Sequence, residues 1–157
     1  MSIKINSGFT FIELVLVIAI TAIIGMVVVP QFGLTLNSVH SEVATNKLMD
    51  DIRFTQNYAV TNHCNTWFSV DQANNSYSYG FYATPPSSDP QLITDPATNG
   101  TSVVSLDVYP NIQITNETLS GNLNFDWFGQ PSSGATITIN ENINIVISNE
   151  TGYVVQN

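Results

Sequence analysis

The sequence predicts an α+β fold, in which one long N-terminal helix packs on a C-terminal head of antiparallel β-strands. Two patterns in the 157 residues support this prediction. The first third of the chain is apolar and then amphipathic at helical spacing. The remainder consists of short alternating segments separated by Pro, Gly, Asn and Asp, which are typical of strands and turns. We find no internal repeat in the sequence. The helix is expected to bury its apolar face by covering one sheet of a single head.

The first predicted element is the apolar half of the helix, residues 9–30. No charge occurs between Leu14 and Val29. At about 1.5 Å per residue, a helix from Phe9 to Val29 is about 30 Å long, which matches the hydrocarbon core of a bilayer. A secretory signal is shorter and ends at a small-residue cleavage site, and a buried core helix is a third interpretation. The length and the many β-branched residues favour a membrane-spanning segment.

The amphipathic half of the helix is expected at residues 31–62. Gly25 and Pro30 come just before it, and because proline removes an intrahelical hydrogen bond, a kink or local loosening is expected there. Asn62 and His63 are expected to end the helix. The apolar side chains expected to pack on the head recur at spacings of three to five or more: Leu36, Val39, Val43, Leu48, Ile52 and Ala59.

The head, residues 63–157, is predicted to be built of strands. A hairpin is expected from Thr66–Val70 and Tyr77–Tyr82, because the residues between them favour a turn. Residues 84–101 are rich in Pro, Ser, Asp and Gly and are expected to form a long exposed loop. The remaining predicted strands are Val103–Val108, Ile112–Ile114, Leu123–Phe125, Ala135–Ile139, Ile143–Ile147 and Gly152–Val155.

The charge composition argues against a nucleic-acid partner. The formal net charge is −9, and the cations of the sequence are Lys4, Lys47 and Arg53. A surface that binds nucleic acid needs clustered Lys or Arg to neutralise phosphates. Because Cys64 is the single cysteine, an internal disulfide is excluded and stability is expected to come from packing.

The sequence gives little support for a catalytic site or a metal-binding site. Cys64 follows His63, but adjacent side chains rarely point at each other and no third orienting group is evident, so neither an enzyme nor a cofactor is predicted. His40 and His63 lack the spacing of a zinc site. Four acids have the oxygen chemistry of calcium ligands but no EF-hand spacing, so a solvated acidic surface is expected instead: Asp50, Asp51, Asp89 and Asp95.

Glu13 lies near one end of the apolar segment. An acid in the middle of a bilayer costs about 2.5–3.5 kcal/mol on insertion scales, so a carboxylate found there usually has a partner and a role. The alternative is that Glu13 lies at the membrane interface and turns its carboxylate to the water. Gly8-Phe9-Thr10-Phe11-Ile12-Glu13, followed by the apolar run and Pro30, resembles the type IV prepilin signature of type IV pilins and type II secretion pseudopilins.

This resemblance implies how the N-terminus matures. Residues 1–8 would form a leader peptide, which prepilin peptidase removes by cutting between Gly8 and Phe9, and the new amine of Phe9 would be N-methylated. That amine would then be a cation at a helix N-terminus in an apolar bundle. Glu13, one turn away on the same or a neighbouring subunit, would neutralise it and set the axial register between subunits.

Three later stretches resemble one branch of the superfamily, the H-type pseudopilins (GspH) and the FimT/FimU-like minor pilins. Residues 51–61 are similar to the end of the helix in that branch. Phe125-Asp-Trp-Phe-Gly129-Gln-Pro131 is similar to its F-x-x-x-G-x-P turn, in which Trp127 and Phe128 are candidate exposed contacts. Residues 145–154 are similar to its closing hairpin, although the basic residues that the family often has near the closing Gly152 are missing here.

The resemblance implies a pilin-like fold and a structural role as a minor pilin or pseudopilin. Such a subunit would assemble into, or prime, a type II secretion pseudopilus or a type IV pilus. Its partners would be other pilin or pseudopilin subunits, prepilin peptidase and the assembly platform. It would cross the inner membrane once, with its head in the periplasm, before it enters the filament. The alternative is a FimT-like DNA-binding minor pilin for natural transformation, against which the charge argues.

Overall fold

The computed structural model describes residues 9–83, 89–95, 99–119 and 121–157, and the side chains of residues 27–35 are left out as well. The predicted leader, residues 1–8, lies outside the described residues. The chain divides into two compact units, residues 1–38 and 39–157, with one long helix passing from one unit into the other. Each unit is described by itself below.

Helix α1 (Phe11–Asn62) contains 52 residues, so the prediction of one long helix is confirmed. The helical assignment continues through Gly25 and Pro30, and the kink expected there stays a prediction. The helix ends where the sequence indicates. His63 has a φ of 51°, and the Cys64 amide donates to the Ala59 carbonyl at 3.2 Å, which closes the last turn in a Schellman-like cap.

The apolar half of α1 coincides with the predicted membrane span. Within the described part of the chain, no helix is both long and apolar enough to cross a membrane. The predicted span, residues 9–30, includes residues 27–30, whose side chains lie outside that part.

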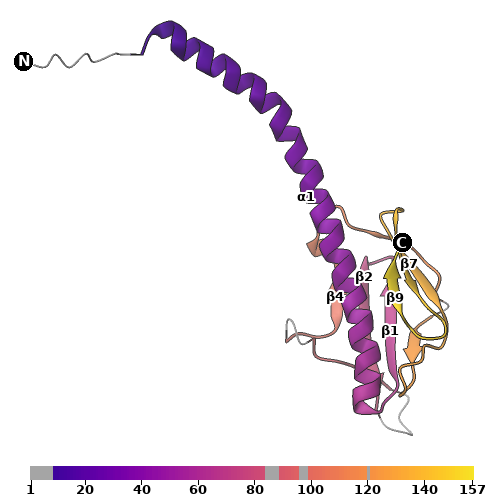
Figure 1. The fold of residues 1–157 in the computed structure, drawn as a ribbon. Coiled ribbons are helices and arrows are strands. Elements are labelled where there is room, and N and C mark those ends of the chain that lie inside the picture. The colour runs from indigo at the N-terminus through magenta and orange to yellow at the C-terminus, as the bar shows by residue number, and fades with distance from the viewer. Residues whose placement is uncertain (1–8, 84–88, 96–98, 120) are drawn as a thin grey trace, which may run out of the picture. The chain divides into compact units, whose positions relative to one another are not determined.

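The head contains two antiparallel sheets rather than the one sheet that was expected under the helix (Figure 1). The first sheet has the order β3-β2-β1-β6, and β4 also pairs with β2. Its strands are β1 (Thr66–Asp71), β2 (Ser76–Tyr82), β3 (Pro90–Leu92), β4 (Val103–Ser105) and β6 (Leu123–Phe125). The second sheet has the order β5-β7-β8-β9. Its strands are β5 (Ile114–Glu117), β7 (Ala135–Ile139), β8 (Ile143–Ile147) and β9 (Val154–Gln156).

Within the head unit, α1 is bound to both sheets. The Thr66 hydroxyl at the start of β1 donates to the Thr55 carbonyl at 3.1 Å, and the Arg53 guanidinium donates to the Val154 carbonyl in β9 at 3.0 Å. The core between these elements is apolar, as the alternation in β7 and β8 predicts. Its fully buried large side chains include Leu48, Ile52, Phe68, Tyr77, Tyr79, Phe125, Ile137 and Ile145.

The face that α1 turns to the head differs from the predicted face in its first turns. Leu48, Ile52 and Ala59 are buried as predicted. Leu36, Val39 and Val43 are 57%, 47% and 46% exposed, so their assignment to the core is wrong. The packed face begins at Ala44, and Val43 lies roughly 100° around the helix from it. The spacing of the apolar residues therefore grouped together side chains that lie on two different faces of the helix.

Residues 84–101 were expected to form a loop, but their described part contains a short edge strand. Strand β3 pairs with β2 so that Leu92 faces Gly80, and Thr94 bridges Thr101. Glycine permits this pairing, because a Cβ at Gly80 would lie 1.9 Å from the Gln91 carbonyl oxygen.

The other strands differ from prediction only at their ends. β6, β7 and β8 have the predicted bounds. β5 begins two residues later than expected and runs to Glu117. β4 is short because a 3-10 helix, Leu106–Val108, follows it at once.

Candidate functional site

The first candidate site is the start of α1. Thr10 precedes the helix, and its backbone amide and its hydroxyl both donate to Glu13 Oε2 at 2.8 Å. The Glu13 amide donates back to Thr10 Oγ1 at 3.4 Å. This reciprocal arrangement is a capping box, which satisfies two of the free amides at a helix N-terminus. The role of Thr10 as the N-cap was not predicted, although the T-x-x-E signal lies within the quoted hexapeptide.

In the single chain, then, Glu13 binds its own helix start. Phe9, the residue whose amine is its predicted partner, is 82% exposed and precedes the cap. The pairing of Glu13 with the amine of Phe9, the cleavage after Gly8 and the methylation of Phe9 stay predictions. In the single chain, the hydrogen bonds of the capping box hold the Glu13 carboxylate at the helix end.

The helix that follows Glu13 carries apolar side chains on all sides. Among the described side chains, those of Leu14, Ile18 and Ile23 are 56%, 58% and 66% exposed. Apolar surface of this extent is rare on isolated soluble proteins and marks a site of contact with lipid or protein. This segment therefore requires a cover outside the chain itself.

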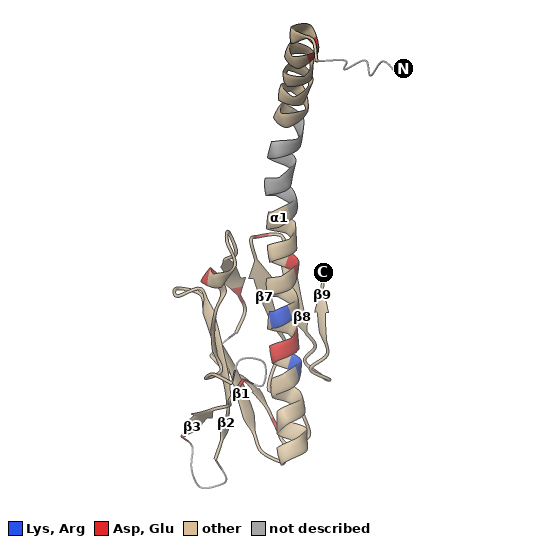
Figure 2. Cartoon of the chain, turned by 90° about the vertical axis from the view of Figure 1, so that its left-hand side faces the viewer, with Lys and Arg blue, Asp and Glu red and all other residues tan. Residues whose placement is uncertain are grey.

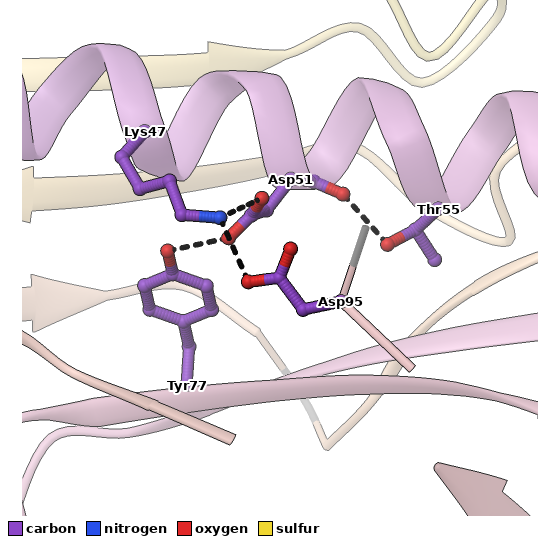
Figure 3. A network of polar contacts seen from close by, with 5 residues as sticks. All are labelled: Lys47, Asp51, Thr55, Tyr77 and Asp95. Atoms are coloured by element: carbon purple, nitrogen blue, oxygen red, sulfur yellow. Dashed lines mark hydrogen bonds and ion pairs between the residues drawn. The ribbon is translucent and has the colours of Figure 1, made fainter. Parts of the chain in front are cut away.

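The second candidate site is a polar network under the head half of α1 (Figure 3). The Lys47 ammonium contacts Asp51 Oδ1 at 2.6 Å and Asp95 Oδ2 at 3.3 Å. Tyr77 Oη donates to the second oxygen of Asp51 at 2.7 Å, and Thr55 Oγ1 donates to the Asp51 carbonyl at 2.7 Å. The Asp51 carboxylate thus joins the helix to strand β2, and Lys47 joins it to the loop that carries Asp95.

The network shows that the expected solvated acidic surface is wrong for two of the four acids. Asp51 and Asp95 are 5% and 2% exposed, so they are buried, whereas Asp50 lies outside and pairs with Arg53 at 3.2 Å. The structure does bring together two of the four acids weighed for calcium, but the Lys47 ammonium supplies the cation between them. In the ranges that the structure describes, no group of three or more His, Cys, Asp or Glu side chains could hold a metal ion.

Burial is the leading cause of the pKa shifts of Asp51 and Tyr77 in this network. It raises the pKa of Asp51 above its ordinary value, although Lys47 and the Tyr77 hydroxyl act in the opposite direction. Burial acts to lower the pKa of Lys47, but the hydrogen bonds and charges of Asp51 and Asp95 outweigh it, so the pKa of Lys47 is raised. Burial and the Asp51 carboxylate raise the pKa of Tyr77 as well. Burial is therefore the main reason why Asp51 holds a proton more tightly than usual, and the nearby charge of Asp95 acts in the same direction.

The third candidate site contains the motifs that resemble the minor pilin branch. The side-chain amide of Gln56 on α1 donates to the Gly129 carbonyl and to the Thr151 carbonyl, both at 2.8 Å. A Cβ at Gly152, which has a φ of 68°, would lie 2.6 Å from Gln56 Nε2. The predicted turn and the closing hairpin therefore lie against the same residue of the helix. Gln56 was missed, because a polar residue on an amphipathic helix gives no sign of its partner.

Trp127 and Phe128 project from the first of these turns. They are 49% and 69% exposed, and their ring centroids lie 3.9 Å apart. The turn is held by Asp126, whose Oδ1 accepts hydrogen bonds from the amides of Phe128 at 3.0 Å and Gln130 at 2.8 Å. Their role as contacts stays a prediction, but both rings are exposed on a well-braced turn.

The remaining candidates show no catalytic arrangement. Burial raises the pKa of the Cys64 thiol, which lowers the fraction present as the reactive thiolate. The His63 ring packs edge-on against Trp127, with their centroids 6.4 Å apart.

The cations of the described head are engaged within the molecule. Lys47 is bound in the buried network, and Arg53 contacts Asp50 and the Val154 carbonyl. Both lie on α1, and acids lie beside them (Figure 2). In the described residues, therefore, no basic patch is available to neutralise a phosphate backbone.

Comparison with solved structures identifies the fold. No protein-family model and no curated protein matches the sequence. The chain is similar to the minor pseudopilin EpsH from the type 2 secretion system of Vibrio cholerae, with a TM-score of 0.59 and 11% identity over 74% of this chain and 94% of that chain. It is also similar to the type IV minor pilin FimU of Pseudomonas aeruginosa in two crystal forms.

The first of these forms, in space group P21, has a TM-score of 0.54 and 15% identity over 74% of this chain and 87% of that chain. The second, in space group P65, has a TM-score of 0.52 and 14% identity over 74% of this chain and 91% of that chain. The chain therefore has the pilin-like α+β fold of minor pilins and minor pseudopilins, as the sequence predicts.

Proposed function

We propose that this protein is a structural subunit, a minor pilin or pseudopilin that joins or primes a thin filament built at the inner membrane. The observation that carries the proposal is the pilin-like head on a 52-residue helix, whose described side chains before residue 27 are mostly exposed and apolar. A structural subunit uses such a helix as a shared core, because side chains that find no cover within the chain are covered by neighbouring subunits. No catalytic role is needed.

The finer parts of this function rest on the N-terminal signature. The leader, residues 1–8, is cut between Gly8 and Phe9 by prepilin peptidase, and Phe9 is methylated. Residues 9–30 span the inner membrane, with Gly25 and Pro30 as the place where the helix bends. Residues 31–62 connect to the head, residues 63–157, which lies in the periplasm. On assembly, Glu13 moves from its capping box to the amine of a neighbouring Phe9, where it neutralises a charge that is otherwise isolated in an apolar bundle.

Capping and charge pairing are separable by one substitution. Glutamine at the third helical position still caps the helix but carries no charge. We expect Glu13→Gln to be cut by prepilin peptidase as the unchanged protein is, yet to be depleted from the sheared filament fraction. Glu42→Gln, which removes an exposed acid from the second half of the helix, is the matched control and should enter filaments normally.

The measurements are mass spectrometry of the mature N-terminus and immunoblotting of purified filaments. Entry of Glu13→Gln at the unchanged level would rule out the charge pairing while leaving the subunit function in place. If the unchanged, processed protein were absent from every filament fraction and did not affect filament number when deleted, the proposed function itself would be wrong.

A further inference from the structure

A pocket of about 430 Å³ lies at the end of the first sheet, beside the turn that carries Trp127 and Phe128. It forms where β1 begins, β2 ends and β6 leads into that turn. Its volume is in the range of small-molecule sites. Six of its eight lining residues have polar side chains: Asn65, Tyr82, Asn124, Asp126, Gln130 and Ser132. Phe125 and Pro131 complete the lining, and apolar atoms supply the larger share of its surface.

Hydrogen bonds within the lining hold the pocket in shape. Tyr82 Oη donates to Asn124 Oδ1 at 3.0 Å, and the Tyr82 amide donates to the Asn65 carbonyl at 2.9 Å. The Asp126 amide donates to the Gln130 carbonyl at 2.9 Å, and the Ser132 amide donates to the Asn124 carbonyl at 2.7 Å. A site that is already ordered loses little conformational entropy when a ligand binds.

The lining selects a ligand by its chemistry. Three side-chain amides and a serine hydroxyl offer both donors and acceptors, and Asp126 adds an acceptor with a negative charge. The lining contains no Lys or Arg, so it supplies no charge for a phosphate, sulfate or carboxylate. An apolar ligand would gain no hydrogen bonds from these polar groups, whereas a ligand with hydroxyl groups can bond to them. A neutral ligand that is rich in hydroxyl groups fits this lining best.

The exposed aromatic pair lies on the turn that borders the pocket. Trp127 and Phe128 stand between the pocket-lining Asp126 and Gln130, so pocket and rings are parts of one turn. Sugar rings are amphipathic: their hydroxyls form hydrogen bonds to amides and carboxylates, and their C–H faces pack on aromatic rings. Exposed aromatic residues also occur at protein interfaces, but a protein partner would not require a polar pocket beside them. We propose that this pocket, with Trp127 and Phe128, binds a neutral oligosaccharide.

The first test measures binding to the full-length protein in a detergent without a sugar headgroup, because a maltoside would compete. Cellohexaose, maltohexaose and N-acetylchitohexaose are titrated by calorimetry. The location is read from fluorescence in a Trp67→Phe variant, because Trp67 is only 7% exposed and Trp127 is then the single emitter. We expect at least one sugar to bind, with a blue shift of the emission and protection from acrylamide quenching. Failure of all three sugars to bind at millimolar concentration would overturn the proposal.

The second test uses variants at exposed positions, which are expected to fold normally. Trp127→Ala and Gln130→Ala should each weaken the measured affinity about tenfold or more, which corresponds to about 1.4 kcal/mol. Tyr153→Ala is the matched control, because it removes a 65% exposed ring from the closing hairpin and should leave the affinity unchanged.

Thermal unfolding of each variant checks that the head is intact. Unchanged affinity in both Trp127→Ala and Gln130→Ala would place the sugar elsewhere and overturn the proposal. So would a result in which no sugar binds and Trp127→Ala instead abolishes association with another pilin-like subunit, because the pair would then be a protein interface.

Discussion

At the scale of single residues, Gln56 holds two turns of the head against the helix through polar contacts. A primary amide carries two N–H donors, and Gln56 uses its amide to bond the carbonyls of Gly129 and Thr151. These carbonyls belong to turns that are far apart in the sequence. One side chain therefore fixes the relative position of the two sheets along the helix.

Removing this side chain is expected to destabilise the head. Gln56→Ala loses two hydrogen bonds of about 0.5–1.5 kcal/mol each, so the free energy of unfolding should fall by about 1–3 kcal/mol. Denaturant unfolding followed by circular dichroism measures the change. Gln156→Ala removes an exposed glutamine from β9 and should change stability by less than about 0.5 kcal/mol. Equal effects of the two substitutions would contradict the role of Gln56.

The buried network gives a second prediction, because it contains two carboxylates and one ammonium. Lys47→Met leaves Asp51 and Asp95 without the cation between them and should destabilise the protein by about 3–5 kcal/mol at neutral pH. Asp51→Asn leaves the Lys47–Asp95 pair balanced and should cost much less. Stability curves of both variants at pH 7 measure this asymmetry. A larger loss in Asp51→Asn would refute it.

The pH dependence of this loss of stability follows from the direction in which folding shifts the pKa of Asp51. The folded state raises that pKa above the unfolded value, so the contribution of Asp51 to stability is more favourable at low pH and is lost as the pH rises through the folded pKa. Without Lys47 the pKa rises further. The deficit of Lys47→Met relative to the unchanged protein should therefore shrink as the pH falls below 7. A constant deficit between pH 7 and pH 4 would show that the lost contacts are not electrostatic.

At the scale of elements, the predicted boundaries were best where a single pattern determines the structure. β6, β7 and β8 were predicted with their observed bounds, because alternating residues between clear turns leave one arrangement of buried and exposed faces. The end of α1 was also predicted, because Asn62 and His63 tolerate the cap geometry. The local sequence is therefore sufficient to predict these boundaries.

Elements that depend on tertiary pairing were not predictable in the same way. β3 consists of exposed residues that resemble a loop, and it becomes a strand because β2 offers it an edge. Leu36, Val39 and Val43 have core-like spacing, but their side chains are exposed. The Lys47 network was missed for the same reason, since Asp95 is 48 residues from Lys47 in the sequence.

The pairing of β2 with β3 depends on the missing side chain of Gly80. Gly80→Ala would place a Cβ 1.9 Å from the Gln91 carbonyl oxygen and 2.7 Å from the Trp67 ring, so β3 should detach from the sheet. Hydrogen exchange of residues 89–95 measures this, and exchange there should become faster. Ser78→Ala in the same strand is the control and should leave the exchange of that segment unchanged. Protection of residues 89–95 in Gly80→Ala would disprove the dependence.

At the scale of the whole molecule, the distribution of charge decides between structural assembly and DNA capture. The formal net charge is −9, and the described cations of the head are already bound to acids or carbonyls. Phosphate contacts supply most of the affinity for non-specific DNA. The head of this protein therefore lacks the groups that a sequence-independent DNA receptor needs.

A gel-shift experiment tests this conclusion. Full-length protein in detergent, at micromolar concentration and low salt, should not shift double-stranded DNA. Adding two cations on the exposed face of α1, as in the Glu42→Lys, Asn46→Lys double variant, should produce weak binding that disappears with added salt. A salt-sensitive shift by the unchanged protein would restore the DNA-receptor hypothesis.

The engagement of Lys47 and Arg53 inside the molecule also affects how copies of the protein meet. Lys47 is largely covered, and Arg53 is neutralised at the surface by Asp50, so the other acids keep the net charge at −9 and identical chains repel one another at close range. A uniform row of such heads accumulates this repulsion with every added copy. Neighbours of different charge relieve it. Charge alone therefore disfavours contact between two copies of this chain and favours contact with a less acidic one.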